Sequence, residues 1–187
     1  MLYLPPRWAH DGDALGEDCM TCSIGFRAPQ RGGLAAELLQ RMADEVDDTA
    51  LYRDPHQPAT ATPAAMPAGL LDFAQEGLQR LLADRHGLAC ALGEVMTEPK
   101  PSTWFDEPAS DWQPGAVCLD RRTRMMYDEQ RVFANGESWR AGGKDARHLR
   151  QLADQRFLTA SVVAQVSVAV RELLNQWAED GWLHPLA

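Results

Sequence analysis

Prolines set the strongest limits on how this chain can fold. Proline donates no backbone hydrogen bond and has a fixed φ, so it is excluded from helix interiors and from central strands. The 187 residues hold twelve prolines, with a pair at 5–6, four between 54 and 67, and two at 99 and 101. The pair ends a first strand, the second group predicts an extended connector, and the third marks the start of a C-terminal unit.

The first 28 residues have the pattern of two strands. Residues 2–4 are apolar and stop at the proline pair, and residues 19–26 form a longer strand after a polar turn at 11–13. Two strands alone are marginally stable in water. The pattern therefore predicts part of a sheet that lacks its neighbouring strands.

Cys19 and Cys22 form a CxxC motif, which can indicate zinc or redox chemistry. Residues three apart on a strand point to opposite faces, so these two thiols cannot easily converge on one metal ion. No second CxxC or Cys/His pair lies at the spacing of a zinc finger. We expect neither a metal nor a redox role for this motif.

From residue 34 the apolar residues follow helical spacing. One helix is expected to run to about residue 52, and a second from about residue 69 to Gly87. Both hold too little apolar surface to be stable alone, so they should pair with each other, with the sheet or with a second copy of the chain. A homodimer through this helical region is the hypothesis. The expected apolar faces are Leu34, Leu38, Leu39, Met42 and Val46 in the first helix, and Leu70, Phe73, Ala74, Leu78, Leu81 and Leu82 in the second.

The rest of the chain has the pattern of a winged-helix unit. Short strands are followed by a hairpin with an Asn-Gly turn, whose left-handed dihedrals suit a two-residue loop. The expected elements are strands at 116–119 and 124–127, a hairpin turning at Asn135-Gly136, a short helix over 144–154, a long helix from Thr159 to about Glu179, and a last strand at 181–183.

Charge and hydropathy exclude several classes of protein. The net charge of −9 disfavours a general nucleic-acid coat, and no apolar stretch is long enough for a membrane span. No basic segment precedes a long apolar one, so no signal peptide is predicted and the cytoplasm is the expected compartment. Nine of the eighteen basic residues lie between Arg121 and Arg156 against five acids, a patch that could meet an acidic partner or RNA or be a solvated surface.

Two motifs near the N-terminus carry a resemblance to a known family. They are LYLPPRWAHDG at residues 2–12 and MTCSIGFRAP at residues 20–29. Together they resemble the closing strands of the JmjC-type double-stranded β-helix in the bacterial ribosomal oxygenases. Those enzymes use Fe(II), 2-oxoglutarate and dioxygen to hydroxylate an arginine of ribosomal protein L16. The order of parts also matches, because in that family a JmjC domain precedes a helical dimerisation region and a winged-helix domain.

The resemblance implies an α+β architecture in three parts. Residues 1–30 would be the terminal strands of an incomplete JmjC/cupin domain, residues 31–95 a helical dimerisation region, and residues 96–187 a winged-helix-like domain. The implied function is that of the C-terminal part of a 2-oxoglutarate-dependent dioxygenase acting on a ribosomal protein.

The resemblance also implies roles for particular residues. His10 matches the second histidine of the Fe(II) site, where two histidines and one carboxylate leave three positions for 2-oxoglutarate and oxygen. Thr21 and Ser23 match positions that line the 2-oxoglutarate pocket, although ordinary inward-facing small residues would explain them equally well. Arg27 either orients the cosubstrate or only ends the strand.

The chain departs from the family pattern in one decisive respect. The HxD motif that supplies the first two iron ligands is absent, because none of the five histidines precedes an acid by two positions. One imidazole cannot hold Fe(II) against water, so no catalytic residue is assigned and we expect the 187 residues alone to be inactive. A start that lies upstream of Met1 is the expected explanation. Cys22, where an aromatic residue is expected, is a milder departure.

Three other interpretations stay open at this stage. The chain could be a non-catalytic winged-helix and dimerisation module that docks to a ribosomal protein or RNA. Sequence-specific DNA binding is disfavoured, because Arg171 is the only basic residue between Ser161 and Glu179. A cupin-like metal- or sugar-binding fold would explain the strands but not the winged-helix half. A decayed gene would keep the family and lose the activity.

Overall fold

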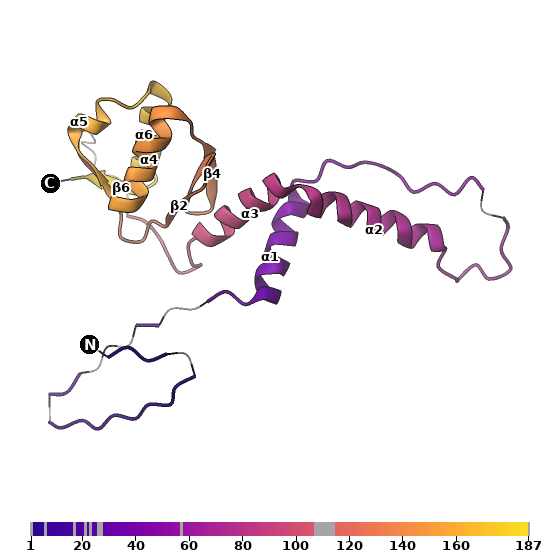
Figure 1. The fold of residues 1–187 in the computed structure, drawn as a ribbon, viewed down its shortest axis with the longest axis horizontal. Coiled ribbons are helices and arrows are strands. Elements are labelled where there is room, and N and C mark those ends of the chain that lie inside the picture. The colour runs from indigo at the N-terminus through magenta and orange to yellow at the C-terminus, as the bar shows by residue number, and fades with distance from the viewer. Residues whose placement is uncertain are drawn as a thin grey trace. The chain divides into compact units, whose positions relative to one another are not determined.

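The computed structural model divides the chain into two compact units, residues 1–30 and residues 31–187. Figure 1 traces both units. Among the described residues, no helix has the length and apolar character needed to cross a membrane. The structure describes residues 2–5, 7–16, 18–20, 22, 24–25, 28–56, 58–106 and 115–186.

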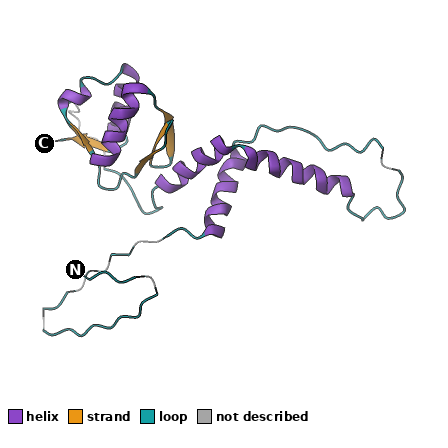
Figure 2. Ribbon diagram, viewed as in Figure 1, coloured by secondary structure: helices purple, strands orange, loops and turns teal. Residues whose placement is uncertain are grey.

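The N-terminal unit contains neither helix nor strand among its described residues, and Figure 2 shows it as loop. The strands expected at 2–4 and 19–26 are therefore wrong for the described part of this chain. The large apolar side chains Leu2, Tyr3 and Ile24 are all exposed. A strand forms only when its backbone groups are paired by a neighbour, and these residues have no neighbouring strand to pair with.

Three helices open the second unit. They are α1 (Arg31–Asp44), α2 (Ala68–Ala83) and α3 (Arg85–Thr97). The first two correspond to the expected helices, although α1 ends at Asp44, eight residues before the predicted end at residue 52.

Helix α3 was not predicted, and the expected stop of the second helix at Gly87 is wrong. Asp84 separates α2 from α3, and its carboxylate accepts hydrogen bonds from the backbone N–H groups of His86 and Gly87. This cap begins a new helix where the glycine predicted an end. A further glycine in α3, Gly93, lowers its helical propensity but is needed for packing, because a Cβ there would overlap the ring of Phe133.

The winged-helix part holds two three-stranded antiparallel sheets. In the first sheet β1 lies between β5 and β6, and in the second β3 lies between β2 and β4. The Asn-Gly turn is confirmed, since Asn135 and Gly136 both have positive φ and join β3 to β4. The elements are β1 (Val117–Leu119), β2 (Met125–Tyr127), β3 (Arg131–Ala134), β4 (Glu137–Arg140), α4 (Gly143–Gln155), β5 (Phe157–Leu158), α5 (Ala160–Val163), α6 (Val168–Glu179) and β6 (Leu183–Pro185).

The long helix expected from Thr159 to Glu179 is two helices. Helix α5 ends at Val163, and α6 begins after Ser167, whose hydroxyl accepts a hydrogen bond from the backbone N–H of Val170. Serine competes with the helix for backbone groups, so it is favoured as an N-cap and not in a helix interior. The apolar stripe nevertheless stays buried on both sides of the break.

The core of the second unit lies between the two sheets and helices α4 and α6. The buried indole of Trp177 on α6 packs edge-to-face against Trp139 of β4, with ring centroids 5.1 Å apart. The cluster contains Val117, Leu119, Val132, Ala134, Leu149, Leu152, Leu158, Val163, Val166, Val170, Leu174, Trp177, Ala178 and Leu183. All helices and strands from β1 to β6 contribute a buried side chain to this cluster, except β2 and β4. Met125 of β2 and Trp139 of β4 are partly buried and pack against the cluster.

Candidate functional site

Of the site residues expected from the sequence, His10 is the one that the structure describes. Its side chain is exposed and forms no hydrogen bond or ion pair with the described residues. Thr21, Ser23 and Arg27 lie outside the described residues. The structure therefore does not test the expected 2-oxoglutarate residues.

The described residues do not fit an Fe(II) site. No group of three or more His, Cys, Asp or Glu side chains within the described ranges is placed to hold a metal ion. Three protein ligands are the minimum for the facial arrangement that leaves positions for 2-oxoglutarate and oxygen. We therefore derive no reaction step from these residues.

A small pocket lies between the helices of the second unit. Arg41 of α1 donates to Glu94 of α3 at 3.4 Å and also to Glu98, which joins these two helices by charged hydrogen bonds. Met42, Leu81 and Ala91 line the pocket beside these charges. Its volume of about 220 Å³ is below the usual size of a small-molecule site.

A carboxylate directly after β1, at the end of the central strand of the first sheet, contacts two basic side chains. Asp120 accepts hydrogen bonds from the Arg122 guanidinium at 2.9 and 3.1 Å, and it lies 3.0 Å from Nε2 of His184 on β6. The Arg122 guanidinium holds the pKa of Asp120 well below its ordinary value, and burial opposes this shift. These contacts connect the residue after β1 with the last strand, which is a structural role.

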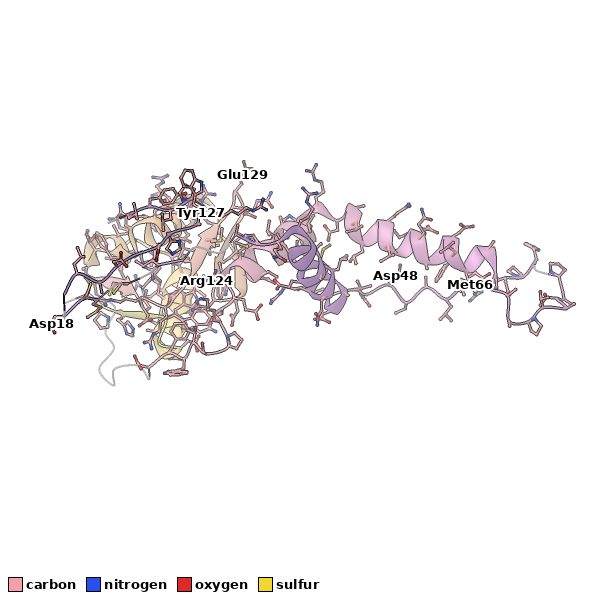
Figure 3. The ribbon with its side chains drawn as sticks, turned by 90° about the horizontal axis from the view of Figure 1, so that it is seen from below. Asp18, Asp48, Met66, Arg124, Tyr127 and Glu129 are labelled. Atoms are coloured by element: carbon pink, nitrogen blue, oxygen red, sulfur yellow. The ribbon has the colours of Figure 1, made fainter. Side chains whose placement is uncertain are left out.

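A groove lies between β2 and α4. Tyr127 donates from its hydroxyl to the Asp154 carboxylate at 3.0 Å, and the Arg150 guanidinium lies over the Tyr127 ring at 5.5 Å from its centroid. The Asp154 carboxylate raises the pKa of the Tyr127 hydroxyl. Gly143, Arg147 and Gln151 also line the groove. Figure 3 shows Tyr127 together with Glu129 of the turn that follows β2.

The sequence predicted the basic stretch in this region but not the groove. The missed residues are Tyr127 and Asp154, whose contact depends on how β2 packs beside α4. A pairing of a tyrosine with an acid 27 residues later leaves no local signal in the sequence.

Family models match both parts of the chain. The model of the ROXA-like winged helix matches residues 80–184, and the model of the JmjC domain matches residues 1–34. The fold and the match at residues 80–184 define a winged-helix protein. The N-terminal residues of the same chain match the JmjC domain.

Comparison with known proteins also finds ribosomal oxygenases. The ribosomal protein uL16 3-hydroxylase of Escherichia coli (strain K12) is 31% identical over 151 residues, which are 73% of this chain and 39% of that protein. The X-ray structure of E. coli ycfD gives a TM-score of 0.69 at 20% identity, covering 86% of this chain and 46% of that one. The structure of the E. coli ribosomal oxygenase YcfD in complex with cobalt and succinic acid gives a TM-score of 0.68 at 21% identity. That match covers 85% of this chain and 47% of the YcfD chain. The structure of YcfD in complex with cobalt and 2-oxoglutarate gives a TM-score of 0.66 at 20% identity.

The chain belongs to the family of ROXA-like winged-helix proteins. The resemblance to the C-terminal portion of the ribosomal oxygenases is confirmed, as is the α+β fold class. The chain spans about 39% of the length of the curated relative it matches.

Proposed function

We propose that this chain forms the C-terminal portion of a 2-oxoglutarate- and Fe(II)-dependent oxygenase that hydroxylates a ribosomal protein. The observation that carries the proposal is the 31% identity over 151 residues to a uL16 3-hydroxylase. The JmjC match at residues 1–34 also supports it, because it covers the two motifs that suggested the family. The proposed substrate is an arginine side chain of L16, and the proposed compartment is the cytoplasm, where ribosomal proteins are assembled.

The proposed roles of individual residues come from the matched motif. His10 would be one iron ligand, and Thr21 and Ser23 would lie beside 2-oxoglutarate. The remaining ligands are not in this sequence, because it contains no HxD or HxE. When bound, the iron and 2-oxoglutarate would supply the oxidising chemistry, and the protein would position the substrate.

The proposed domain organisation keeps the boundaries 1–30, 31–95 and 96–187. Within it, residues 31–95 form a homodimer interface. The apolar side chains of α2 support this part of the proposal, because none of them is buried within one chain and an exposed apolar face favours association with a partner. Light scattering should give twice 20.7 kDa for the purified chain, and a monomeric mass would contradict the dimer.

The hydroxylase proposal is tested on the ribosomes of the source organism. Intact-mass and peptide mass spectrometry should find one added oxygen atom on an L16 arginine in the wild type. That oxygen should be lost when the gene is deleted and restored by the native gene on a plasmid. A wild-type strain with unmodified L16, or a deletion strain that keeps the modification, would contradict the proposal.

The same strains test His10. Replacing His10 by Ala in the native gene should abolish the modification, while Cys19→Ala, a neighbouring change outside the proposed site, should leave it unchanged. Normal modification in the His10→Ala strain would show that His10 is not a ligand.

A further inference from the structure

The two described sheets have four edge strands, and three of these are protected against pairing with another chain. Natural sheets protect an edge with charged side chains, with proline or by keeping the strand very short. Strand β6 contains Pro185, β4 has Glu137 and Arg140 at its ends, and β5 is two residues long. Strand β2 is the uncharged run Met125–Tyr127, without proline. It is therefore the unprotected edge of the described sheets.

The backbone groups on the outer side of β2 are unpaired. In an antiparallel pair, hydrogen-bonded residues alternate with residues whose backbone groups point away from the neighbouring strand. Backbone bonds of 3.0 Å at Arg124 and at Asp128 place the positions bonded to β3 at residues 124, 126 and 128. Met125 and Tyr127 therefore direct two N–H and two C=O groups away from β3. None of these four groups has a backbone partner among the described residues.

Helix α4 borders this edge on one face of the sheet. The hydroxyl of Tyr127 (Figure 3) donates to Asp154 of α4 at 3.0 Å, beside the groove of about 540 Å³ between β2 and α4. Arg147 and Arg150 also line this groove, and Asp154 is the one carboxylate among its described lining residues. The lining is therefore net positive, and its carboxylate is already occupied by the tyrosine hydroxyl. A side chain that enters the groove from a strand beside β2 is favoured when it is acidic.

Helix α3 borders the edge on the opposite face. Met126 points to this face, because side chains alternate along a strand and Tyr127 points to α4. Cys90 of α3 contacts Ser138 of β4 at 3.2 Å, and Leu92 lies about 200° further around the helix, on the flank toward β2. Leu92 is 39% exposed and Met126 is 45% exposed. An apolar side chain on this face of an added strand would remove apolar surface from water.

We propose that β2 binds an extended segment of a partner protein, which adds to the second sheet as a fourth, antiparallel strand. In antiparallel pairing, residues directly opposite each other share a face, so the partner residues bonded to Met125 and Tyr127 point to α4. The residues between them point to α3. The segment that fits alternates acidic side chains in the α4 groove with apolar side chains against Leu92 and Met126.

The main-chain bonds of such a strand supply affinity, and its alternating side chains supply specificity. A second copy of β2 does not fit the same edge, because it has no acidic side chain for the groove. This inference goes beyond the proposed hydroxylase function, and testing it requires neither iron nor 2-oxoglutarate.

The test is fluorescence anisotropy of a short labelled peptide that alternates glutamate with valine and has both ends blocked, titrated with the purified chain. Binding should saturate. A peptide that alternates lysine with valine should bind about tenfold or more weakly, because its cations would face Arg147 and Arg150. Equal binding of the two peptides would contradict the proposed partner chemistry.

Methylation of the peptide backbone separates strand pairing from side-chain contacts. In the proposed register the glutamate N–H groups donate to β2, and the valine N–H groups point away from it. N-methylation of the glutamates should weaken binding by about tenfold or more, whereas N-methylation of the valines should change it by about twofold or less. Equal effects of the two methylations would overturn the pairing, and this test leaves the protein unchanged.

Two substitutions at one position repeat the test on the protein. Tyr127→Pro removes the outward N–H together with the ring, and Tyr127→Ala removes the ring alone. The proline variant should bind the glutamate–valine peptide about fivefold or more weakly than the alanine variant. Their thermal midpoints should agree closely, because the lost N–H has no backbone partner within the described chain and proline is tolerated on an edge strand. Equal binding by two folded variants would contradict pairing at this N–H.

A charge reversal tests the groove. Arg147→Glu should weaken binding of the glutamate–valine peptide by about fivefold or more. The matched control Arg171→Glu, the same change on α6 outside the groove, should stay within about twofold of the wild type. Absence of saturable binding would overturn the proposal, as would an equal loss in the matched control. None of these outcomes bears on L16 hydroxylation, so the two proposals fail separately.

Discussion

Helices α2 and α6 have similar apolar stripes but opposite environments. In α2 no described side chain is buried, and Leu71 and Leu78 are 61% and 57% exposed. In α6 Val170, Leu174 and Trp177 are all buried in the core. Both stripes follow the helical period, so the period alone does not decide burial. A helix face is buried only where other elements of the fold cover it.

The contacts of the two helices explain the difference. Helix α6 packs beside β6, and its Trp177 packs against Trp139 of the second sheet. The contacts of α2 are few and marginal, including Tyr52 against Phe73 and an ion pair between Arg80 and Asp48. Apolar area removed from water stabilises by about 25 cal/mol per Å², so α6 contributes to the folding of one chain. Helix α2 would contribute mainly when a partner covers it.

The largest effect is expected from Trp177→Ala in α6. Removing this buried indole should lower the free energy of unfolding by about 3–5 kcal/mol, because a cavity opens where it contacts Trp139. Chemical denaturation followed by circular dichroism measures the loss. A change below about 1 kcal/mol would mean that the core relaxes around the cavity and that α6 is less essential than its burial implies.

A second effect comes from the charge cluster at the edge of the core. The pKa of Asp120 is lowered in the folded state by Arg122, so the carboxylate stabilises the fold above its unfolded pKa. This stabilisation should be lost as the pH falls below about 4 and towards the folded pKa, amounting to about 1–3 kcal/mol. Asp120→Asn should flatten the dependence of unfolding free energy on pH in this acid range. If the free energy of unfolding of the variant falls with decreasing pH as it does in the wild type, other carboxylates are responsible for the loss of stability in acid.

Substitution on α2 should have a small effect on the single chain. Leu78→Ala removes an exposed side chain, so the free energy of unfolding at low protein concentration should change by about 0.5 kcal/mol or less. Leu71→Asp with Leu78→Asp should in addition convert the proposed dimer into a monomer in light scattering. A large decrease in the free energy of unfolding at high dilution would contradict the contrast between α2 and α6, because α2 would then be stabilised by contacts within one chain.

The smallest effect has the opposite sign. Arg140→Glu replaces a like-charge pair across β3 and β4 by an opposite-charge pair, so the free energy of unfolding should rise by about 0.2–1 kcal/mol. Arg140→Gln, which only removes the charge, should give about half of this rise. A decrease in both variants would mean that the two guanidinium groups do not face each other in solution.

The sequence predicted those elements whose signals are local. The Asn135-Gly136 turn needs only its own dihedrals, and the apolar stripe of residues 162–177 identifies a buried helical segment without regard to its neighbours. Helix α3 was missed because Gly87 and Gly93 weaken its pattern, and the reason for Gly93 is the ring of Phe133, forty residues later. The break before α6 was missed because its apolar stripe continues across it, although Ser167 was a visible cap.

The candidate site divides in the same way. The motif around His10 identified the family, since a motif needs no fold to be recognised. The strands that it implied do not form among the described residues, because a strand depends on partners from elsewhere in a chain. The position of Arg150 over Tyr127 depends on the packing of α4 beside β2, which residue order alone does not encode.

Asp84 is a joint of a single residue, since it ends α2 and caps α3. Helix α3 is fixed to the second sheet by the close approach of Gly93 to Phe133, so α2 extends from a firm base through one pair of backbone torsions. Each residue of a helix turns it by about 100°. An insertion or deletion of one residue between Leu82 and His86 would therefore re-aim the whole apolar stripe of α2 by more than a quarter turn. In the proposed dimer, the spacing of these five residues would set the direction in which α2 faces its partner, and a change in chain length here would turn that face without replacing any of its side chains.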